Sequence, residues 1–326
     1  MMTRRSVLAS LGALLALPTV VRAQTTAGMR RIVWFGLGPL DARSPYLDAL
    51  RGELRELGWS EGRNLTISRY SSTRAPDDFE VLAREIVAAK PDVVVTQEFT
   101  VSSMHRIQAA VLVVFGFSGD PVDGKLVQSY AHPGTNYTGM SYLASELVGK
   151  RIEFLKEALP HIRRLAILAR PQHPGEHRER AASEEAAQKL GIAVSYFPIR
   201  EVVEIDKAFP AMRQERCDAV VVFPDYIMFV NRERVSRLAL DARMPAISGW
   251  PSFAESGLLL NYGPNLRDLY RGLARYVNRI LRGAKPEDLP VESPRTVELV
   301  VNAQTAKALG IIIPQTILLR ADRVIE

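Results

Sequence analysis

Two short stretches decide the fold: Asp-Val-Val-Val at residues 92–95 and Asp-Ala-Val-Val-Val at residues 218–222. Each is a run of β-branched residues too short for a helix, which is typical of a strand buried on both faces. Similar runs recur in the two halves of the chain at offsets of 133, 126 and about 134 residues, from Ile32 to Leu165, Asp92 to Asp218 and Val111 to Pro245. Because a nearly constant offset indicates an internal repeat, the sequence predicts two copies of one lobe.

Helical patterns separate the predicted strands in both halves. In the first half we expect strands at residues 32–36, 65–70, 93–96 and 111–115, and helices at 45–57 and 78–89. In the second half we expect strands at 165–169, 192–197, 218–222, 245–248 and 258–261, and helices at 265–281 and 303–309. Ser44, Pro45 and Gly58 suit the N-cap, first turn and C-cap of the first helix. The predicted fold class is α/β, with two doubly wound parallel-sheet lobes and an inter-lobe cleft.

Residues 1–23 have the pattern of a cleaved signal peptide. Arg4 and Arg5 form a basic segment, and residues 7–17 form an apolar run that is too short to span a bilayer. Val21-Arg-Ala23 places small residues at the −3 and −1 positions, so we expect cleavage after Ala23. Thr3-Arg-Arg-Ser-Val-Leu8 also resembles a twin-arginine motif, and both this route and general secretion stay open. The expected location is the periplasm.

The composition excludes several classes of protein. An apolar content of 47% and a charged content of 24% exclude a disordered chain, and the single Cys217 excludes an internal disulfide. Loss of the signal peptide removes three arginines and lowers the formal net charge from +6 to +3. Arg178 and Arg180 flank Glu179, and this alternation of charges favours a solvated surface over a nucleic-acid-binding stripe.

The Gly36-Leu-Gly38 stretch is half of a dinucleotide-binding fingerprint. Asp41 stands where the third glycine would be, and the predicted helix starts too late for a tight phosphate turn. Arg69 and Arg74 follow the second strand and could read a 2′-phosphate, which leaves an exported NADP-dependent oxidoreductase as an alternative. We otherwise expect no cofactor.

Two further motifs contain residue types that are used in catalysis or metal binding. Residues 116–119, Gly-Phe-Ser-Gly, lack the Gly-x-Ser-x-Gly spacing of a nucleophile elbow. His173 and His177 have the spacing of a helical metal pair, but Pro174 and Gly175 lie between them and break the helical register. We therefore expect a surface loop there, with no metal, no catalytic residue and no enzyme activity.

Ligands of doubly wound lobes bind at the carboxyl ends of the strands. If the lobes face each other, one cleft is lined by the loops at 36–44, 97–103, 116–121, 169–175, 223–229 and 248–253. Aromatic candidates on or beside these loops include Phe99, Tyr226 and Trp250, of which Trp250 is favoured because it directly follows a strand. Asp120 and Asp225 could each bind an ammonium group or hydrogen-bond loop amides.

Several stretches match a known family in order and spacing. They lie at residues 50–58, 61–65, 82–95, 119–122, 132–136, 138–140, 149–156, 262–266, 280–286 and 305–310, and include Tyr262-Gly-Pro-Asn-Leu266 and Thr305-Ala-Lys-Ala-Leu-Gly310. Over nearly all of residues 30–326 the chain resembles the periplasmic substrate-binding proteins of ABC transporters, in the branch related to tryptophan- and tyrosine-binding components. The resemblance implies a type I periplasmic-binding fold with three crossing segments.

The resemblance also implies a ligand and its contacts. The ligand would be a small molecule, often an aromatic amino acid or a related carboxylate, that is passed to an ABC permease in the inner membrane. The first-lobe contacts would fall at Thr96, Gln97 and Ser118, and the second-lobe contacts near Arg170, Asp225 and Trp250, with Tyr262 near a crossing. We expect a monomer that binds no nucleic acid; a sensory receptor with the same fold remains an alternative.

The expected lobes are discontinuous in sequence. Residues 29–141 with 263–290 would form lobe 1, and residues 142–262 with 291–326 would form lobe 2, although the pattern leaves the lobe of the tail open. Residues 97–113 depart from the family pattern, since Gln97-Glu-Phe-Thr-Val replaces a turn of small residues. This region would line the pocket, so the resemblance implies the fold but does not fix the identity of the ligand.

Overall fold

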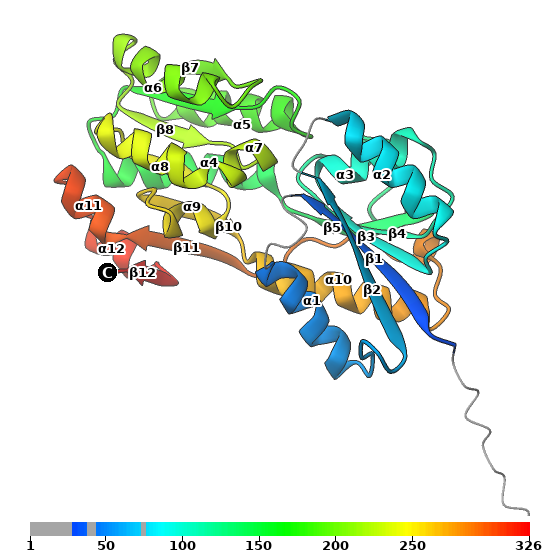
Figure 1. Cartoon of the computed structure of the whole chain (residues 1–326). Coiled ribbons are helices and arrows are strands. Elements are labelled where there is room, and N and C mark those ends of the chain that lie inside the picture. The colour runs from blue at the N-terminus through cyan, green and yellow to red at the C-terminus, as the bar shows by residue number, and fades with distance from the viewer. Residues whose placement is uncertain (1–27, 38–43, 73–75) are drawn as a thin grey trace, which may run out of the picture.

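The computed structural model describes residues 28–37, 44–72 and 76–326 of the chain. Two twisted sheets lie in separate lobes, and each sheet has helices on both faces (Figure 1). The predicted α/β fold class with two doubly wound lobes is confirmed. The predicted signal peptide, Gly38 and Arg74 lie outside the described residues.

The first sheet has five parallel strands in the order β2-β1-β3-β4-β5. Its strands are β1 (Arg30–Leu37), β2 (Leu65–Ser72), β3 (Val93–Gln97), β4 (Val113–Phe117) and β5 (Tyr137–Ser141). One face is covered by α1 (Pro45–Glu56) and α10 (Leu266–Leu281), the other by α2 (Pro76–Ala88) and α3 (Phe99–Arg106). Alternate residues of β1 therefore enter different cores: Trp34 packs toward α1 and α10, and Phe35 toward α2 and α3.

The second sheet has seven strands in the order β12-β11-β10-β9-β8-β6-β7. They are β6 (Arg164–Ala169), β7 (Ala193–Pro198), β8 (Ala219–Val222), β9 (Ala246–Ser248), β10 (Leu260–Pro264), β11 (Val297–Asn302) and β12 (Arg323–Ile325). Helices α4 (Ala144–Ala158) and α5 (Glu176–Lys189) cover one face, and α6 (Glu204–Gln214), α8 (Arg232–Asp241) and α9 (Pro251–Glu255) cover the other. Shorter elements are α7 (Tyr226–Val230), a 3-10 turn at Pro286–Asp288, α11 (Ala303–Leu309) and α12 (Gln315–Leu318).

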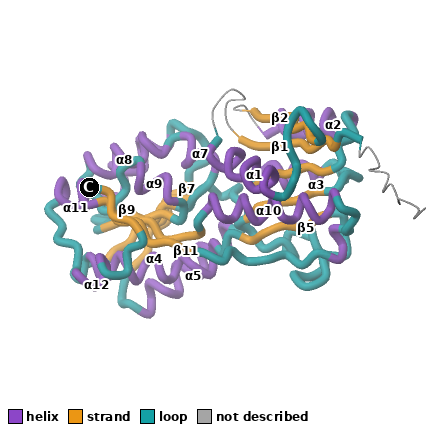
Figure 2. The backbone as a smooth tube through the Cα atoms, turned by 90° about the horizontal axis from the view of Figure 1, so that it is seen from below, coloured by secondary structure: helices purple, strands orange, loops and turns teal. Residues whose placement is uncertain are grey.

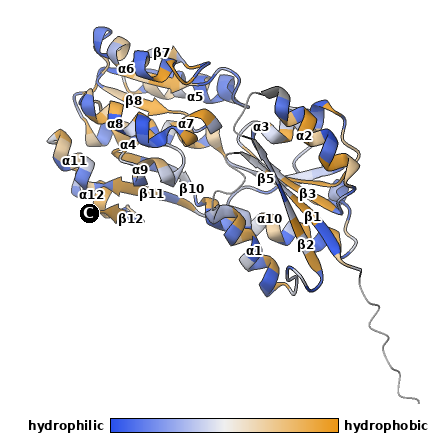
Figure 3. Cartoon of the chain, viewed as in Figure 1, coloured by the Kyte–Doolittle hydropathy of each residue, from blue (hydrophilic) through white to orange (hydrophobic). Residues whose placement is uncertain are grey.

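The two sheets share one topology. The order β2-β1-β3-β4-β5 of the first lobe is repeated as β7-β6-β8-β9-β10 in the second, which bears out the repeat read from the strand offsets. The second lobe then adds β11, antiparallel to β10, and β12. In Figure 3 the strands of both lobes are mostly orange and the outer sides of the helices carry most of the blue, as expected for parallel sheets buried on both faces.

Several predicted boundaries shift by a few residues. Strand β4 begins at Val113 rather than Val111, and β10 runs from Leu260 to Pro264 rather than from 258 to 261, because the apolar runs extend beyond the residues that enter the ladder. The predicted loop at 97–103 is mostly helix α3. The predicted N-cap of α1 is confirmed, since Ser44 accepts a hydrogen bond from the amide of Leu47; the C-cap is Leu57, one residue before the predicted Gly58, which follows at φ +94°.

The chain crosses between the lobes around residues 142–144, 264–266 and 292–297. Helix α10 lies against α1 and the first sheet although the strands on either side of it in sequence, β10 and β11, belong to the second sheet (Figure 2). The amides of Val291 and Glu292 still pair with Tyr130 and Gly139 of the first lobe, slightly past the predicted boundary at residue 290. None of the helices described in the structure is long and apolar enough to traverse a bilayer.

Candidate ligand-binding site between the lobes

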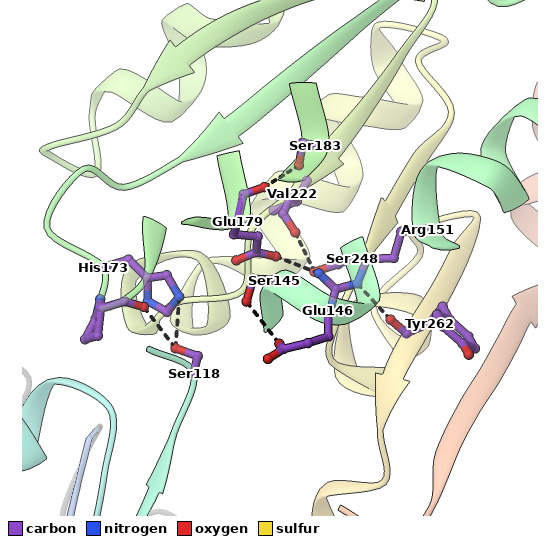
Figure 4. Close-up of polar contacts among 11 residues, drawn as sticks. Ser118, Ser145, Glu146, Arg151, His173, Glu179, Ser183, Val222, Ser248 and Tyr262 are labelled. Atoms are coloured by element: carbon purple, nitrogen blue, oxygen red, sulfur yellow. Dashed lines mark hydrogen bonds and ion pairs between the residues drawn. The ribbon is translucent and has the colours of Figure 1, made fainter. Parts of the chain in front are cut away.

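The two lobes touch through a buried hydrogen-bond chain at the carboxyl ends of their strands. Ser118 follows β4 of the first lobe, and His173 lies in the loop after β6 of the second. Ser118 Oγ lies 2.6 Å from Glu98 Oε2 and 3.1 Å from His173 Nε2, and Figure 4 shows Ser118 pointing at His173. One hydroxyl hydrogen serves one acceptor, so Ser118 donates to Glu98 while the Nε2–H of His173 donates to Ser118.

His173 is only 5% exposed, and burial lowers its pKa to about 3, with the charge of Arg170 adding to the effect. The imidazole is therefore neutral at physiological pH, and donation from Nε2 assigns its hydrogen to that nitrogen. The expectation of a surface loop at His173 was wrong, because the turn that carries it packs against the first lobe; His177 is exposed.

A contact between two glycines brings the backbones of the lobes together. A Cβ atom on Gly175 would lie 2.8 Å from the Cα atom of Gly119, closer than real Cβ contacts allow. Gly175 also has φ +83°, a conformation that residues with side chains rarely adopt. The lobes can approach this closely only because neither position has a side chain.

Ion pairs lie at the rim beside this contact. Arg178 of α5 pairs with Asp120 at 3.1 Å and also with Asp123, both from the first lobe. Asp120 Oδ1 accepts hydrogen bonds from the amides of Val122 and Asp123, so its position is fixed by its own turn. The structure is therefore a closed arrangement with direct polar contacts between the lobes.

Glu98 is the most unusual residue of this group. Its side chain is 3% exposed, its backbone has φ +50° and ψ −122°, and its Oε1 atom is buried without a hydrogen-bond partner. Burial raises the pKa of Glu98 to about 8; the hydrogen bond from Ser118 opposes this rise, and the charges of Asp225 and Glu179 add to it. Such a conformation and such an orphaned atom are typical of functional sites.

The second lobe contributes Arg170 and Asp225. Their side chains form an ion pair at 3.6 Å, and Asp225 Oδ1 caps α7 by accepting from the amide of Met228 at 2.8 Å. Burial raises the pKa of Asp225 to about 6, against the opposing effects of the Met228 amide and Arg170. The guanidinium of Arg170 also lies 5.7 Å from the ring centroid of Phe99, so this pair reaches across to the first lobe.

Aromatic rings join the lobes on the hinge side. Trp250, 8% exposed, lies between Tyr142 and Phe229, with ring centroids 6.2 Å and 5.8 Å away. The hydroxyl of Tyr142 is 3.1 Å from that of Tyr270, whose ring stacks on Tyr46 at 5.2 Å. The boundary between the lobes thus offers large apolar faces next to a few buried polar groups, the usual composition of a small-molecule site.

The structure brings together only some of the residues predicted as ligand contacts. Phe99, Ser118, Arg170 and Asp225 are linked at the lobe boundary, Trp250 lies on its aromatic side, and Tyr226 is the half-buried first residue of α7. Asp120 lies at the rim.

The remaining predicted contacts bond or pack within one lobe. The hydroxyl of Thr96 is 2.7 Å from that of Thr100, which also bonds to the backbone of Gln97. The ring of Tyr262 packs on Phe154 at 5.0 Å.

Sequence reasoning missed Glu98, although it lies inside the stretch that departs from the family pattern. It also placed Glu179 on a solvated surface, which was wrong: Glu179 is fully buried, and its Oε1 atom accepts from Arg151 at 2.6 Å (Figure 4). Burial raises the pKa of Glu179 to about 7 in spite of that partner. Within the described ranges, no cluster of three or more His, Cys, Asp or Glu side chains is arranged to hold a metal ion.

Comparison with known proteins identifies the family. The family model described as ABC transporter substrate binding protein matches residues 40–325. A Clostridioides difficile protein named tyrosine-binding protein is 21% identical over 257 residues, which cover 78% of this chain and 74% of that protein.

Solved structures with the same fold include three relatives. A conserved domain protein from Vibrio cholerae has 26% identity and a TM-score of 0.83, over 91% of this chain and 99% of that one. An ABC domain from Streptococcus pneumonia in complex with L-Trp has 22% identity and a TM-score of 0.83, over 91% and 100%. The ligand-free, open structure of a Clostridium difficile substrate-binding protein with adhesive properties has 22% identity and a TM-score of 0.65, over 91% and 99%.

These matches agree with the two-lobed α/β fold. The family consists of binding proteins and not of enzymes, which confirms the expectation that this chain is not an enzyme. The chain belongs to the family of ABC transporter substrate-binding proteins.

Proposed function

We propose that this protein is an exported receptor that captures a small ligand between its lobes and delivers it to an importing ABC permease. The favoured ligand is an aromatic amino acid or a related small carboxylate. The observation that carries the proposal is the set of two bonded pairs, Glu98 with Ser118 and Arg170 with Asp225, to which the two lobes contribute at the carboxyl ends of their strands. The named tyrosine-binding relative and the L-Trp complex support the ligand class.

Both lobes contribute to the apolar and to the polar part of the proposed site. Trp250, Phe99 and Tyr226 would pack against an apolar ligand body, and the Arg170 guanidinium and the Ser118 hydroxyl would bind its polar end. A ligand that contacts both lobes stabilises the closed arrangement over an open one. The lower similarity of this closed chain to the open relative than to the L-Trp complex, at equal sequence identity, supports such a movement.

The cellular setting is part of the same proposal. Cleavage after Ala23 would release a periplasmic protein, exported by general secretion or by the twin-arginine route. We propose that it acts as a monomer, with the permease as its protein partner.

A thermal-shift screen of residues 24–326 tests this function. The panel contains amino acids, aromatic carboxylates, small peptides, sugars and NADP. A ligand present at 100 times its Kd adds about 2.7 kcal/mol to the free energy of unfolding, enough to raise Tm visibly. We expect a shift with an aromatic amino acid or carboxylate, together with a smaller radius of gyration in solution scattering. A shift with NADP alone would overturn the proposal.

A further inference from the structure

Four carboxyl side chains are buried in the described part of the chain: Glu98, Glu176, Glu179 and Asp225. Three of them have an arginine within reach. Arg151 lies 2.6 Å from Glu179, Arg170 lies 3.6 Å from Asp225, and Arg180 lies 3.7 Å from Glu176. Among the described residues no lysine or arginine forms an ion pair with Glu98, although it lies at the lobe boundary.

The geometry of Glu98 leaves one oxygen free for another partner. Ser118 occupies Oε2, whereas Oε1 is buried and accepts no hydrogen bond. Glu98 occupies the N-cap position of α3, yet its side chain does not cap the helix, and its backbone has a positive φ. An unpaired buried acceptor and a strained backbone both destabilise the fold, so they are expected to persist where binding uses them.

We propose that Glu98 Oε1 accepts a hydrogen bond from the protonated amine of the ligand, so that the receptor selects amine-bearing ligands over their deaminated counterparts. The inference rests on the proposed function, because it needs a ligand between the lobes. It names Glu98 as the residue that determines specificity, and it requires the ligand to carry a positive charge.

The surroundings of Glu98 favour a cation over an anion. Burial is the main cause of the raised pKa of Glu98, and the negative charges of Asp225 and Glu179 in the second lobe raise it further. Two arginines of the second lobe, Arg170 and Arg151, pair with Asp225 and Glu179 and not with Glu98. Three further titratable side chains of the described residues here are neutral at physiological pH: His173, and Tyr142 and Tyr270, whose hydroxyls bond to each other.

Glu98, Asp225 and Glu179 are paired with only two arginines between them. An ammonium group of the ligand would therefore add the positive charge that Glu98 lacks. On contact with it, Glu98 would ionise and release its proton to solvent, and the resulting ion pair would be strong because it is shielded from water. A ligand carboxylate at the same position would face acids on several sides.

The test measures the affinities of matched pairs of probes by isothermal titration calorimetry. The pairs are L-tyrosine with 3-(4-hydroxyphenyl)propionate and L-tryptophan with 3-(indol-3-yl)propionate; L-lysine and putrescine are added as non-aromatic amines. The variant is Glu98→Gln, whose amide oxygen still accepts from Ser118. The matched control is Glu53→Gln in the same lobe, where Glu53 pairs with Arg275 on α10.

We expect the unmodified protein to bind the amine member of a pair at least about 30-fold more tightly than its deaminated partner. Glu98→Gln should weaken the amine member about 10- to 100-fold and leave the deaminated member nearly unchanged, so that selectivity collapses. Glu53→Gln should preserve both affinities.

Three outcomes would overturn the inference. Equal weakening of both members by Glu98→Gln would mean that Glu98 only positions Ser118. Equal affinity of the unmodified protein for both members would show that the amine makes no specific contact, although the protein would still be a receptor. Failure of every amine to bind would also refute it. If only lysine or putrescine binds, and Glu98→Gln abolishes that binding, the amine contact stands and the aromatic ligand class fails.

Discussion

Equivalent positions in the two lobes carry acids with opposite environments. Glu98 follows β3 and Asp225 follows β8, the matching strands of the repeat, and each is the N-cap residue of the next helix. Asp225 has an extended backbone, caps α7 with its own carboxylate and pairs with Arg170. Glu98 has a positive φ, caps nothing and has an oxygen without a partner. The loop after the third strand of the order thus carries a buried acid in both lobes. Only the second lobe provides that acid with a helix amide and an arginine to bond.

The Arg151–Glu179 pair provides a reference for this comparison, because its loss measures how much a cation beside a buried carboxyl adds to the free energy of unfolding. Arg151→Met should lower the free energy of unfolding by about 3–5 kcal/mol, since it leaves Glu179 buried without its partner. Urea unfolding followed by circular dichroism measures the loss. The exposed neighbour change Lys150→Met is the control, and a loss below about 1 kcal/mol would mean that Glu179 tolerates burial alone, as Glu98 does.

Trp250 separates the aromatic contribution of the second lobe from the amine contribution of Glu98. Trp250→Ala should weaken binding of an aromatic amino acid by roughly 1–3 kcal/mol, because it removes a large apolar face. The preference for the amine member of each probe pair should stay unchanged. Calorimetry measures both quantities, with Trp59→Phe in the first lobe as the control. Unchanged affinity would remove Trp250 from the site.

The pH dependence of stability distinguishes the two acids directly. The folded pKa of Glu98 is raised from 4.5 to about 8, so folded protein holds a proton that unfolded protein has released between these values. The contribution of protonated Glu98 to the free energy of unfolding is fully present below pH 4.5. It is lost as pH rises toward 8, at up to about 1.4 kcal/mol per pH unit. For Asp225, whose pKa is raised from 3.8 to about 6, the corresponding loss of stability ends near pH 6.

Glu98→Gln should therefore gain stability relative to the unmodified protein as pH rises from 6 to 8. Urea midpoints at several pH values measure this difference, and the contributions of Asp225 and His173 cancel because both proteins retain them. A difference that does not change with pH would show that Glu98 is not protonated in the folded state.

Removal of the satisfied carboxyl should have a smaller and different effect. Asp225→Ala should cost about 1 kcal/mol through loss of the helix cap, whereas Asp225→Asn should cost less because asparagine also caps helices. Thermal unfolding at neutral pH compares the two variants. Equal losses for both would mean that the ion pair with Arg170, and not the cap, holds Asp225 in place.

The weakest expected effect lies at the rim. Arg178→Gln removes the pairs with Asp120 and Asp123, which are partly exposed, so it should weaken ligand binding by only about 0.5 kcal/mol, roughly twofold. The difference should vanish near 1 M salt, where charges are screened over a few ångströms. Lys189→Gln, which breaks a pair within α5, should leave affinity unchanged. A salt-independent loss would point to a steric effect of the side chain.

The fold could be predicted from the sequence because its signals are local or periodic. The runs at 93–95 and 219–222 show strands buried on both faces, and their offset shows the repeat. Ser44 and Pro45 mark a helix start that depends on only a few neighbouring residues. Where an apolar run is longer than its strand, as before Val113 and Leu260, composition alone does not show which residue enters the ladder first.

The site was harder to predict because its properties depend on distant residues. Glu179 lies between two arginines in sequence, and only the fold shows that its partner is Arg151, which lies on another helix. The burial of His173 depends on Ser118 from the other lobe. Glu98 lies in the stretch expected to depart from the family pattern, but its orphaned oxygen is a product of three-dimensional packing that no spacing rule encodes.

The placement of α10 also determines when each lobe can be completed during synthesis. Leu269, Tyr270 and Leu273 of this helix fill one side of the first sheet, although they come after five of the seven strands of the second sheet in the chain. A ribosome must therefore release residues as far as Leu281 before the first lobe can bury that side, and the second lobe waits still longer for β11 and β12. Neither lobe can therefore bury its whole core while the chain is only half made.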